Sequence, residues 1–179
     1  ILWNHGDGPK KKGGDSSDVI TTKSICEDLT DGDYLYTAEI TDVLSADESV
    51  TLLGFDACLM GSVEVAYQYR PGNGGFNAEY MVASPASEWG FGWRYDRILE
   101  RLQAVEGDNG ESATVTGGYE AYYDPVFMDA LDFCGVIVEE QYDSTQVEDA
   151  GIETPVQTLS CYDLSYVDEV KDAVDEMAV

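Results

Sequence analysis

The sequence contains one histidine, His5, and it lies 53 positions before Cys58. A nearby imidazole can remove the proton of a thiol or stabilise the thiolate, which then attacks a carbonyl carbon. The oxyanion formed in that attack needs backbone N–H donors, and Gly6 can supply one because it has no side chain to block the approach. Alone, such a cysteine is most often a core residue and such a histidine a surface residue. Their occurrence together favours nucleophilic catalysis.

Both residues follow segments that the sequence predicts to be strands. Residues 1–4 (ILWN) indicate the end of a buried strand, and residues 50–55 (VTLLGF) are continuously apolar, as is typical of a central strand in a parallel sheet covered on both faces. In open α/β sheets, ligands bind outside the carboxyl ends of the strands. We therefore expect the loop at His5 and the loop at Cys58 to meet at one edge of the sheet.

Helical and extended patterns alternate along the rest of the chain, which indicates an α/β domain with a largely parallel sheet. Residues 5–18 are rich in turn formers and are expected to form a mobile loop. The other expected elements are strands at 19–22, 79–84 and 156–162, and helices at 37–46, from about Met60 to Tyr69, at 94–107, from Tyr119 with its first part bounded by Pro125, and after Asp163 as N-cap.

Composition limits the classes of partner. The chain has 179 residues, the length of one ordinary domain, with 36 acidic and 9 basic residues and a net charge of −27. Nucleic acid is an unsuitable partner for such a surface, whereas cations and basic peptides are attracted to it. No apolar run approaches the length of a transmembrane helix. The four cysteines show no C-x-x-C spacing, so neither a zinc site nor a dense disulfide framework is indicated.

Two stretches of sequence and one further residue resemble one peptidase family most clearly. Residues 2–6 (LWNHG), residues 54–61 (GFDACLMG) and Glu64 are similar to the clostripain-like cysteine peptidases, relatives of caspases, gingipains and legumains. Residues 81–93 and 158–170 extend the resemblance more loosely. The resemblance implies a caspase-like three-layer sandwich with a mostly parallel central sheet. It also implies that residues 1–179 are a partial peptidase domain, beginning at the strand before the histidine, whose earlier strands come from the remaining part of the same polypeptide.

The same resemblance implies a cysteine endopeptidase that cleaves after Arg or Lys through a thioester acyl-enzyme. His5 would be the general acid and base, Cys58 the nucleophile, and the N–H groups of Gly6 and Cys58 the oxyanion hole. The partners would be peptides or proteins with Arg or Lys at the cleaved bond, no cofactor would be needed for the chemistry, and the location would be secreted or on a bacterial cell surface. The alternative is a catalytically silent caspase-like module that binds basic peptides.

Acidic and aromatic residues near the site are candidates for substrate binding. Residues two apart in an extended segment project to the same side, so Asp56 can lie near the thiol of Cys58 and meet a substrate cation. Asp56 can also cap a following helix whose start at Leu59 would help ionise the thiol, and the two roles do not exclude each other. Glu88 is either a second substrate-binding acid or a solvated one, and Trp89, like Trp93, is either a pocket wall or a core aromatic.

Two further expectations concern activation and metal binding. Self-cleavage after a basic residue between the histidine and the cysteine is implied by the resemblance, and Lys10, Lys11, Lys12 and Lys23 are the candidates in that interval. The alternative there is an ordinary solvated loop.

The acidic turn at residues 27–33 offers Asp28, Asp31 and Asp33 as oxygen ligands for calcium, although it lacks the full EF-hand pattern. The alternative is a plain acidic turn.

Overall fold

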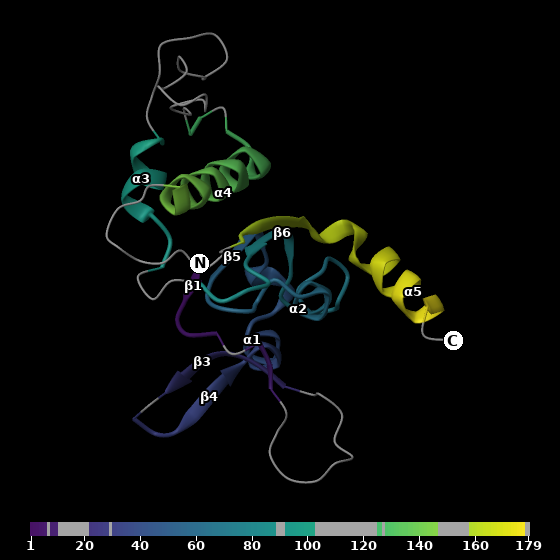
Figure 1. Ribbon diagram of the computed structural model, residues 1–179. Coiled ribbons are helices and arrows are strands. Elements are labelled where there is room, and N and C mark those ends of the chain that lie inside the picture. The colour runs from purple at the N-terminus through teal and green to yellow at the C-terminus, as the bar shows by residue number, and fades with distance from the viewer. Residues whose placement is uncertain are drawn as a thin grey trace. The chain divides into compact units, whose positions relative to one another are not determined.

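The computed structural model describes residues 1–6, 8–10, 22–28, 30–88, 92–102, 125–126, 128–146 and 158–177. The chain divides into two compact units, Ile1–Gly92 with Gln157–Val179 (unit 1) and Trp93–Val156 (unit 2) (Figure 1). The expectation of one peptidase domain over residues 1–179 stays a prediction. Among the described residues, no helix has both the length and the apolar character needed to cross a membrane.

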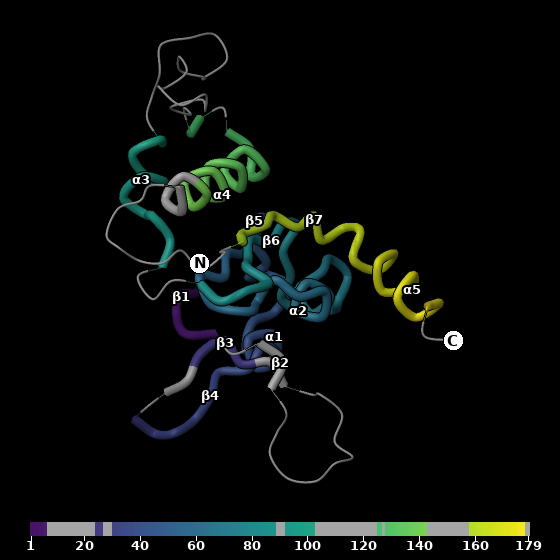
Figure 2. Tube along the Cα trace, in the orientation of Figure 1, coloured from purple at the N-terminus to yellow at the C-terminus, as the bar shows by residue number. Residues whose placement is uncertain are grey.

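Unit 1 is built on a four-stranded sheet with the order β1-β5-β6-β7. Its strands are β1 (Leu2–Trp3), β5 (Val50–Asp56), β6 (Ala78–Ala83) and β7 (Ser160–Asp163) (Figure 2). β1, β5 and β6 are parallel, and β7 is antiparallel to β6. The structure thus confirms an α/β arrangement with a mostly parallel central sheet.

The first strand is exposed in this chain, and the expectation that it is buried stays a prediction, because it assumed neighbouring strands from outside the chain. β1 lies at one edge of this sheet, and among the described strands it pairs only with β5. Ile1 and Trp3 are 61% and 64% exposed. An edge strand has a neighbour on one side only, so apolar side chains there are not enclosed as they are in β5, which is buried from Leu53 to its end.

A second, antiparallel sheet joins β2 (Gly8–Lys10), β3 (Thr22–Asp28) and β4 (Asp33–Tyr36). β2 pairs with β3 through Pro9 opposite Lys23 and Lys10 opposite Thr22. The expectation of a loop throughout residues 5–18 is therefore wrong at residues 8–10. Backbone hydrogen bonding in a ladder depends on a partner strand distant in sequence, which turn-forming residue types do not reveal.

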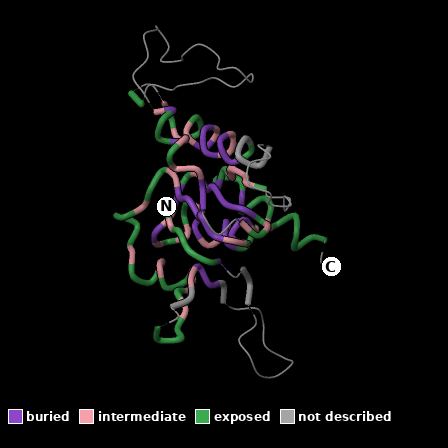
Figure 3. The backbone as a smooth tube through the Cα atoms, turned by 60° about the vertical axis from the view of Figure 1, so that its left-hand side comes forward, coloured by how far each residue is buried: buried purple, intermediate pink, exposed green. Residues whose placement is uncertain are grey.

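The core of unit 1 gathers around β5 and β6, where Figure 3 shows the buried backbone in purple beside the N-terminus. Phe55 lies 5.5 Å from Tyr69 and Tyr69 lies 6.1 Å from Phe76 between ring centroids. Burial raises the pKa of Tyr69, whose hydroxyl donates to the carbonyl of Thr37 at 3.0 Å. That bond links the residue after helix α2 (Val63–Gln68) to the first residue of helix α1 (Thr37–Val43).

Helices occur close to the expected positions but with different ends. α1 ends at Val43 and is followed by the 3-10 helix η1 (Ala46–Glu48), so the helix expected over 37–46 is shorter. The carboxylate of Asp163 accepts from the N–H of Ser165 at 3.0 Å and caps η2 (Leu164–Tyr166), which leads into α5 (Val167–Met177). The predicted cap at Asp163 is confirmed.

Unit 2 contains α3 (Tyr95–Glu100) and α4 (Ala130–Gln146). The buried guanidinium of Arg101 forms ion pairs with Glu139 at 2.8 Å and Glu140 at 3.1 Å, which hold the end of α3 to α4. Asp129 and Asp132 accept from each other's backbone N–H groups, which fixes the start of α4. The expected helix start at Tyr119 lies outside the described residues.

The turn after β5 is held from outside its own sequence. Leu59 has a φ of +62°, uncommon for a residue with a side chain. Its N–H donates to the carbonyl of Ala86 at 2.9 Å, and the N–H of Gly61 donates to the carbonyl of Ser84 at 2.7 Å. The hydroxyl of Tyr162 donates to the carbonyl of Gly61 at 2.9 Å. The loop after β6 and strand β7 therefore fix the shape of this turn.

We expect Gly61→Ala to destabilise the protein. A Cβ at this position would lie 2.6 Å from the backbone N of Pro85 and 2.7 Å from the backbone C of Ser84, neither of which can move without shifting the main chain. Overpacking of this kind costs about 1–3 kcal/mol in free energy of unfolding, measurable by urea denaturation. Gly75→Ala is the control, because its Cβ would meet only the carbonyl of Thr41 at 3.5 Å. Equal losses in both variants would contradict this account.

Candidate active site

Strand register brings the histidine and the cysteine to one edge of the sheet. Trp3 in β1 pairs with Asp56 in β5, and the N–H of Asn4 donates to the carbonyl of Asp56 at 3.2 Å. His5 and Cys58 each lie two residues beyond that pair. Since β1 and β5 run parallel, both residues lie at the carboxyl ends of neighbouring strands, as the sequence predicted.

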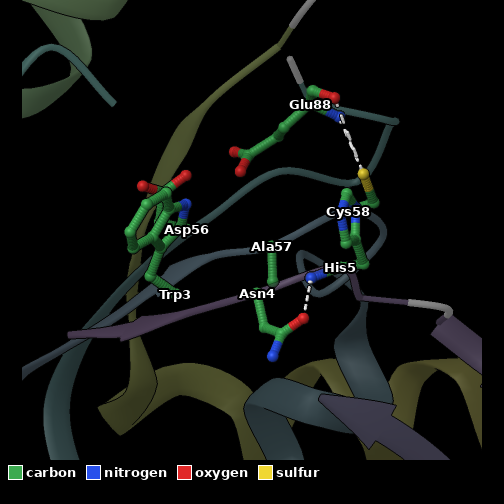
Figure 4. A pocket seen from close by; sticks show the side chains of 7 residues that line it. All are labelled: Trp3, Asn4, His5, Asp56, Ala57, Cys58 and Glu88. Carbon is green, nitrogen blue, oxygen red and sulfur yellow. Dashed lines mark hydrogen bonds between the residues drawn. The ribbon is translucent and has the colours of Figure 1, made fainter. Parts of the chain in front are cut away.

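A pocket of about 250 Å³ opens at this edge (Figure 4). Its lining includes four of the predicted residues, and the structure therefore brings His5, Asp56, Cys58 and Glu88 together. Three lining residues were missed by sequence reasoning: Trp3, Asn4 and Ala57. Their positions could have identified them, because each is next to a predicted residue in the sequence or pairs with one across β1 and β5.

The backbone of Glu88 contacts the sulfur of Cys58. The N–H of Glu88 donates to Sγ at 3.1 Å, and the thiol in turn donates to the carbonyl of Glu88 at 3.7 Å. Figure 4 shows the Glu88 side chain extending away from the thiol toward the side of the pocket where Asp56 and Trp3 lie. The backbone of Glu88 thus contacts the thiol, while its carboxyl group lines the pocket.

Gly6 packs against the main chain of Cys58. A Cβ at Gly6 would overlap the carbonyl oxygen of Cys58 and would lie 3.0 Å from its backbone N. The side chain of Asn4 accepts from the N–H of His5 at 2.6 Å and fixes the backbone just before Gly6. The two residues expected to supply the oxyanion hole are therefore adjacent.

Asp56 is a buried carboxylate, with 2% of the residue exposed. The expectation that it caps a helix beginning at Leu59 is wrong. α2 begins at Val63, and its first turn is capped by the hydroxyl of Ser62, which accepts from the N–H of Val65 at 3.4 Å. The positive φ of Leu59 and the anchored turn delay the helix, which begins at Val63 and not at Leu59.

Other candidates lie away from the pocket or outside the described residues. Trp89, Lys11 and Lys12 are outside them, while Lys10 lies in β2 and Lys23 in β3.

Trp93 is buried in unit 2, with its ring 6.3 Å from that of Tyr95, which fits the core alternative.

The acidic turn predicted to bind calcium joins β3 to β4. Asp28 and Asp33 pair across the two strands, and Asp31 lies in the turn between them. Within the described part of the chain, no three His, Cys, Asp or Glu residues form a group that could hold a metal ion. The side chain of Asp28 is outside that part. Calcium binding at this turn therefore stays a prediction.

Comparison with known proteins relates the whole chain to one family. The sequence pattern of the Clostripain family, peptidase C11, matches residues 1–179. Clostripain from Hathewaya histolytica is 43% identical over 185 residues, which cover 100% of this chain and 34% of that relative. The chain thus spans about a third of the length of the curated relative that it matches.

Two solved structures share the fold. A secreted C11 cysteine protease from Bacteroides thetaiotaomicron, in complex with an irreversible peptide inhibitor, aligns with a TM-score of 0.59 at 23% identity over 97% of this chain and 41% of that one. A cysteine protease from B. fragilis aligns with a TM-score of 0.53 at 20% identity over 80% of this chain and 49% of that one. These similarities confirm the caspase-like fold class. The family match over all 179 residues and the 43% identity together show that this chain belongs to the clostripain family of cysteine peptidases.

Proposed function

We propose that the protein containing this chain is a cysteine endopeptidase that cleaves peptide bonds after Arg or Lys. One observation carries the proposal: a thiol, an imidazole and a buried carboxylate, those of Cys58, His5 and Asp56, line a single pocket. Membership of the clostripain family supports the class of chemistry. The buried carboxylate supports the choice of a cationic side chain at the cleaved bond.

In the proposed reaction, His5 takes the thiol proton and Sγ of Cys58 attacks the carbonyl carbon of the scissile bond. The N–H groups of Gly6 and Cys58 stabilise the resulting oxyanion. The intermediate collapses as His5 protonates the leaving amine, which gives a thioester and the first product. Water, deprotonated by His5, then hydrolyses the thioester and restores the thiol.

Asp56 is proposed to bind the guanidinium or ammonium group of the substrate. An arginine can meet a carboxylate with two parallel hydrogen bonds, which suits a buried acid that lines the pocket. Glu88 would add a second acid to the pocket, and the indole of Trp3 offers a face for a cation. The net charge of −27 would attract basic peptides before they dock.

We expect Asp56→Asn to lower kcat/KM for peptides with Arg or Lys at the cleaved bond by at least about thirtyfold, because loss of one member of a buried charge pair costs about 2 kcal/mol or more. The rate at which iodoacetamide alkylates Cys58 should stay near that of the wild type. Glu79→Gln is the matched acid-to-amide control, since Glu79 is exposed on β6 and does not line the pocket. An undiminished preference for Arg and Lys in Asp56→Asn would rule out this role.

An arginyl chloromethyl ketone separates the enzyme from a silent peptide-binding module. The reagent should alkylate Cys58 in the wild type, as read by peptide mass spectrometry, and labelling should fall to background in His5→Ala because the thiolate then loses its base. Cys134→Ala is the control, because Cys134 is buried in unit 2 and should have no influence. Wild-type protein that binds basic peptides without being labelled would point to the module.

Self-cleavage is proposed to follow one of Lys10, Lys11, Lys12 and Lys23. Lys10 and Lys23 lie in the paired strands β2 and β3, whose hydrogen-bonded backbone must open before it can enter a protease cleft. Intact-mass measurement should find a nicked wild type and an uncut Cys58→Ala variant. Two uncut chains would count against self-activation, as would cutting that persists without the thiol.

Three further parts of the proposal follow the family. Segments outside this chain are proposed to extend the sheet beyond β1, and calcium is proposed to bind at Asp28, Asp31 and Asp33. A secreted or cell-surface location is proposed because a structurally similar Bacteroides protease is described as secreted.

A further inference from the structure

Gly92 brings the main chain into direct contact with the candidate substrate-binding acid. It is buried and has a φ of +74°, in the left-handed region. A Cβ at this position would lie 2.5 Å from Oδ2 of Asp56, 3.2 Å from its Cγ, and 2.7 Å from Nε1 of Trp3. Real Cβ atoms do not approach other heavy atoms so closely. Only glycine therefore fits here with both neighbours in place.

The two neighbours differ in their freedom to move. Trp3 is 64% exposed in the described structure, so its indole has room to turn away. Asp56 is 2% exposed and its side chain is short, so it has little free space. A side chain at position 92 would accordingly displace the Asp56 carboxylate, or the backbone at position 92 would move away from Asp56.

Packing, more than conformation, distinguishes this glycine. Gly32, Gly72 and Gly74 also have positive φ values, of +69°, +81° and +88°, but a Cβ at any of them would meet nothing within 4 Å. Strain in the left-handed region is common to all four positions. Among these positive-φ glycines of the described chain, contact with a candidate functional side chain occurs at Gly92.

We infer that Gly92 is a specificity-determining position, whose bare backbone forms the wall that holds the Asp56 carboxylate in place for the substrate cation. This rests on the proposed cleavage after Arg or Lys. Glu88, four residues earlier, contacts the thiol through its backbone. Two residues that follow β6 therefore contact the two key side chains of the pocket. Glu88 contacts the sulfur of Cys58, and Gly92 packs against the carboxylate of Asp56.

The first test compares two peptide substrates that differ only at the cleaved residue, one with arginine and one with citrulline, whose neutral urea replaces the guanidinium. In the intact protein, Gly92→Ala should lower the ratio of kcat/KM for arginine over citrulline by at least about tenfold, because a small displacement of a binding group has large effects. Alkylation of Cys58 by iodoacetamide should remain within about twofold of the wild type. Gly72→Ala is the control, since it imposes the same backbone strain in open space and should keep the ratio.

A double-mutant cycle tests the contact without relying on activity. Asp56→Ala removes the Asp56 atoms that a Cβ at position 92 would strike and leaves only the contact with Trp3, so Gly92→Ala should lower the melting temperature less in the Asp56→Ala background than in the wild type. Gly72→Ala should cost the same in both backgrounds.

The outcomes separate the two claims. A wild type that does not cleave after Arg or Lys defeats the proposed function, while a non-additive cycle would still establish the contact between Gly92 and Asp56. Additive melting temperatures together with an unchanged arginine-to-citrulline ratio in Gly92→Ala would overturn the inference.

Discussion

In-register parallel pairing of β1 with β5 is the constraint on which the pocket depends. Because Trp3 lies opposite Asp56, the residues that follow each strand leave the sheet at the same level, and His5 and Cys58 line one pocket there. A shift of one residue would turn alternate side chains to the opposite face of the sheet. The pairing is only two residues long, so the neighbouring contacts of Asn4 and Gly6 with β5 and its turn support a register that β1 would hold weakly by itself.

The segment after β6 is the second support of the pocket, and it acts through main-chain atoms. Ala86 and Ser84 hold the turn that carries Cys58, and Glu88 contacts the sulfur. Gly92 packs closely against the carboxylate of Asp56. Backbone groups have fewer conformations than long side chains, so a pocket built from them loses little entropy when it orders. The parallel order β1-β5-β6 makes this possible, because it places all three strand ends at one edge.

Much of the sheet and of the site could be predicted from the sequence, because β5 is a continuous apolar run and the single histidine leaves few possible pairings with a cysteine. The start of α2 could not. Leu59 is ordinary in type, and its positive φ results from contacts with Ala86 and β7, which are distant in sequence. Likewise, Gly92 reads as one more loop glycine until its distance from Asp56 is known. Local patterns predict elements, whereas contacts between loops decide where those elements end.

The pairing of β2 with β3 has a consequence for a chain that is cut between them. β1 and β2 belong to the piece before such a break, and β3 and β5 to the piece after it, yet β1 pairs with β5 and β2 with β3. Each sheet therefore joins one piece to the other. His5 and Cys58 would belong to different polypeptides after the break, and non-covalent contacts, the strand pairing together with those of Asn4 and Gly6, would keep them in the same pocket.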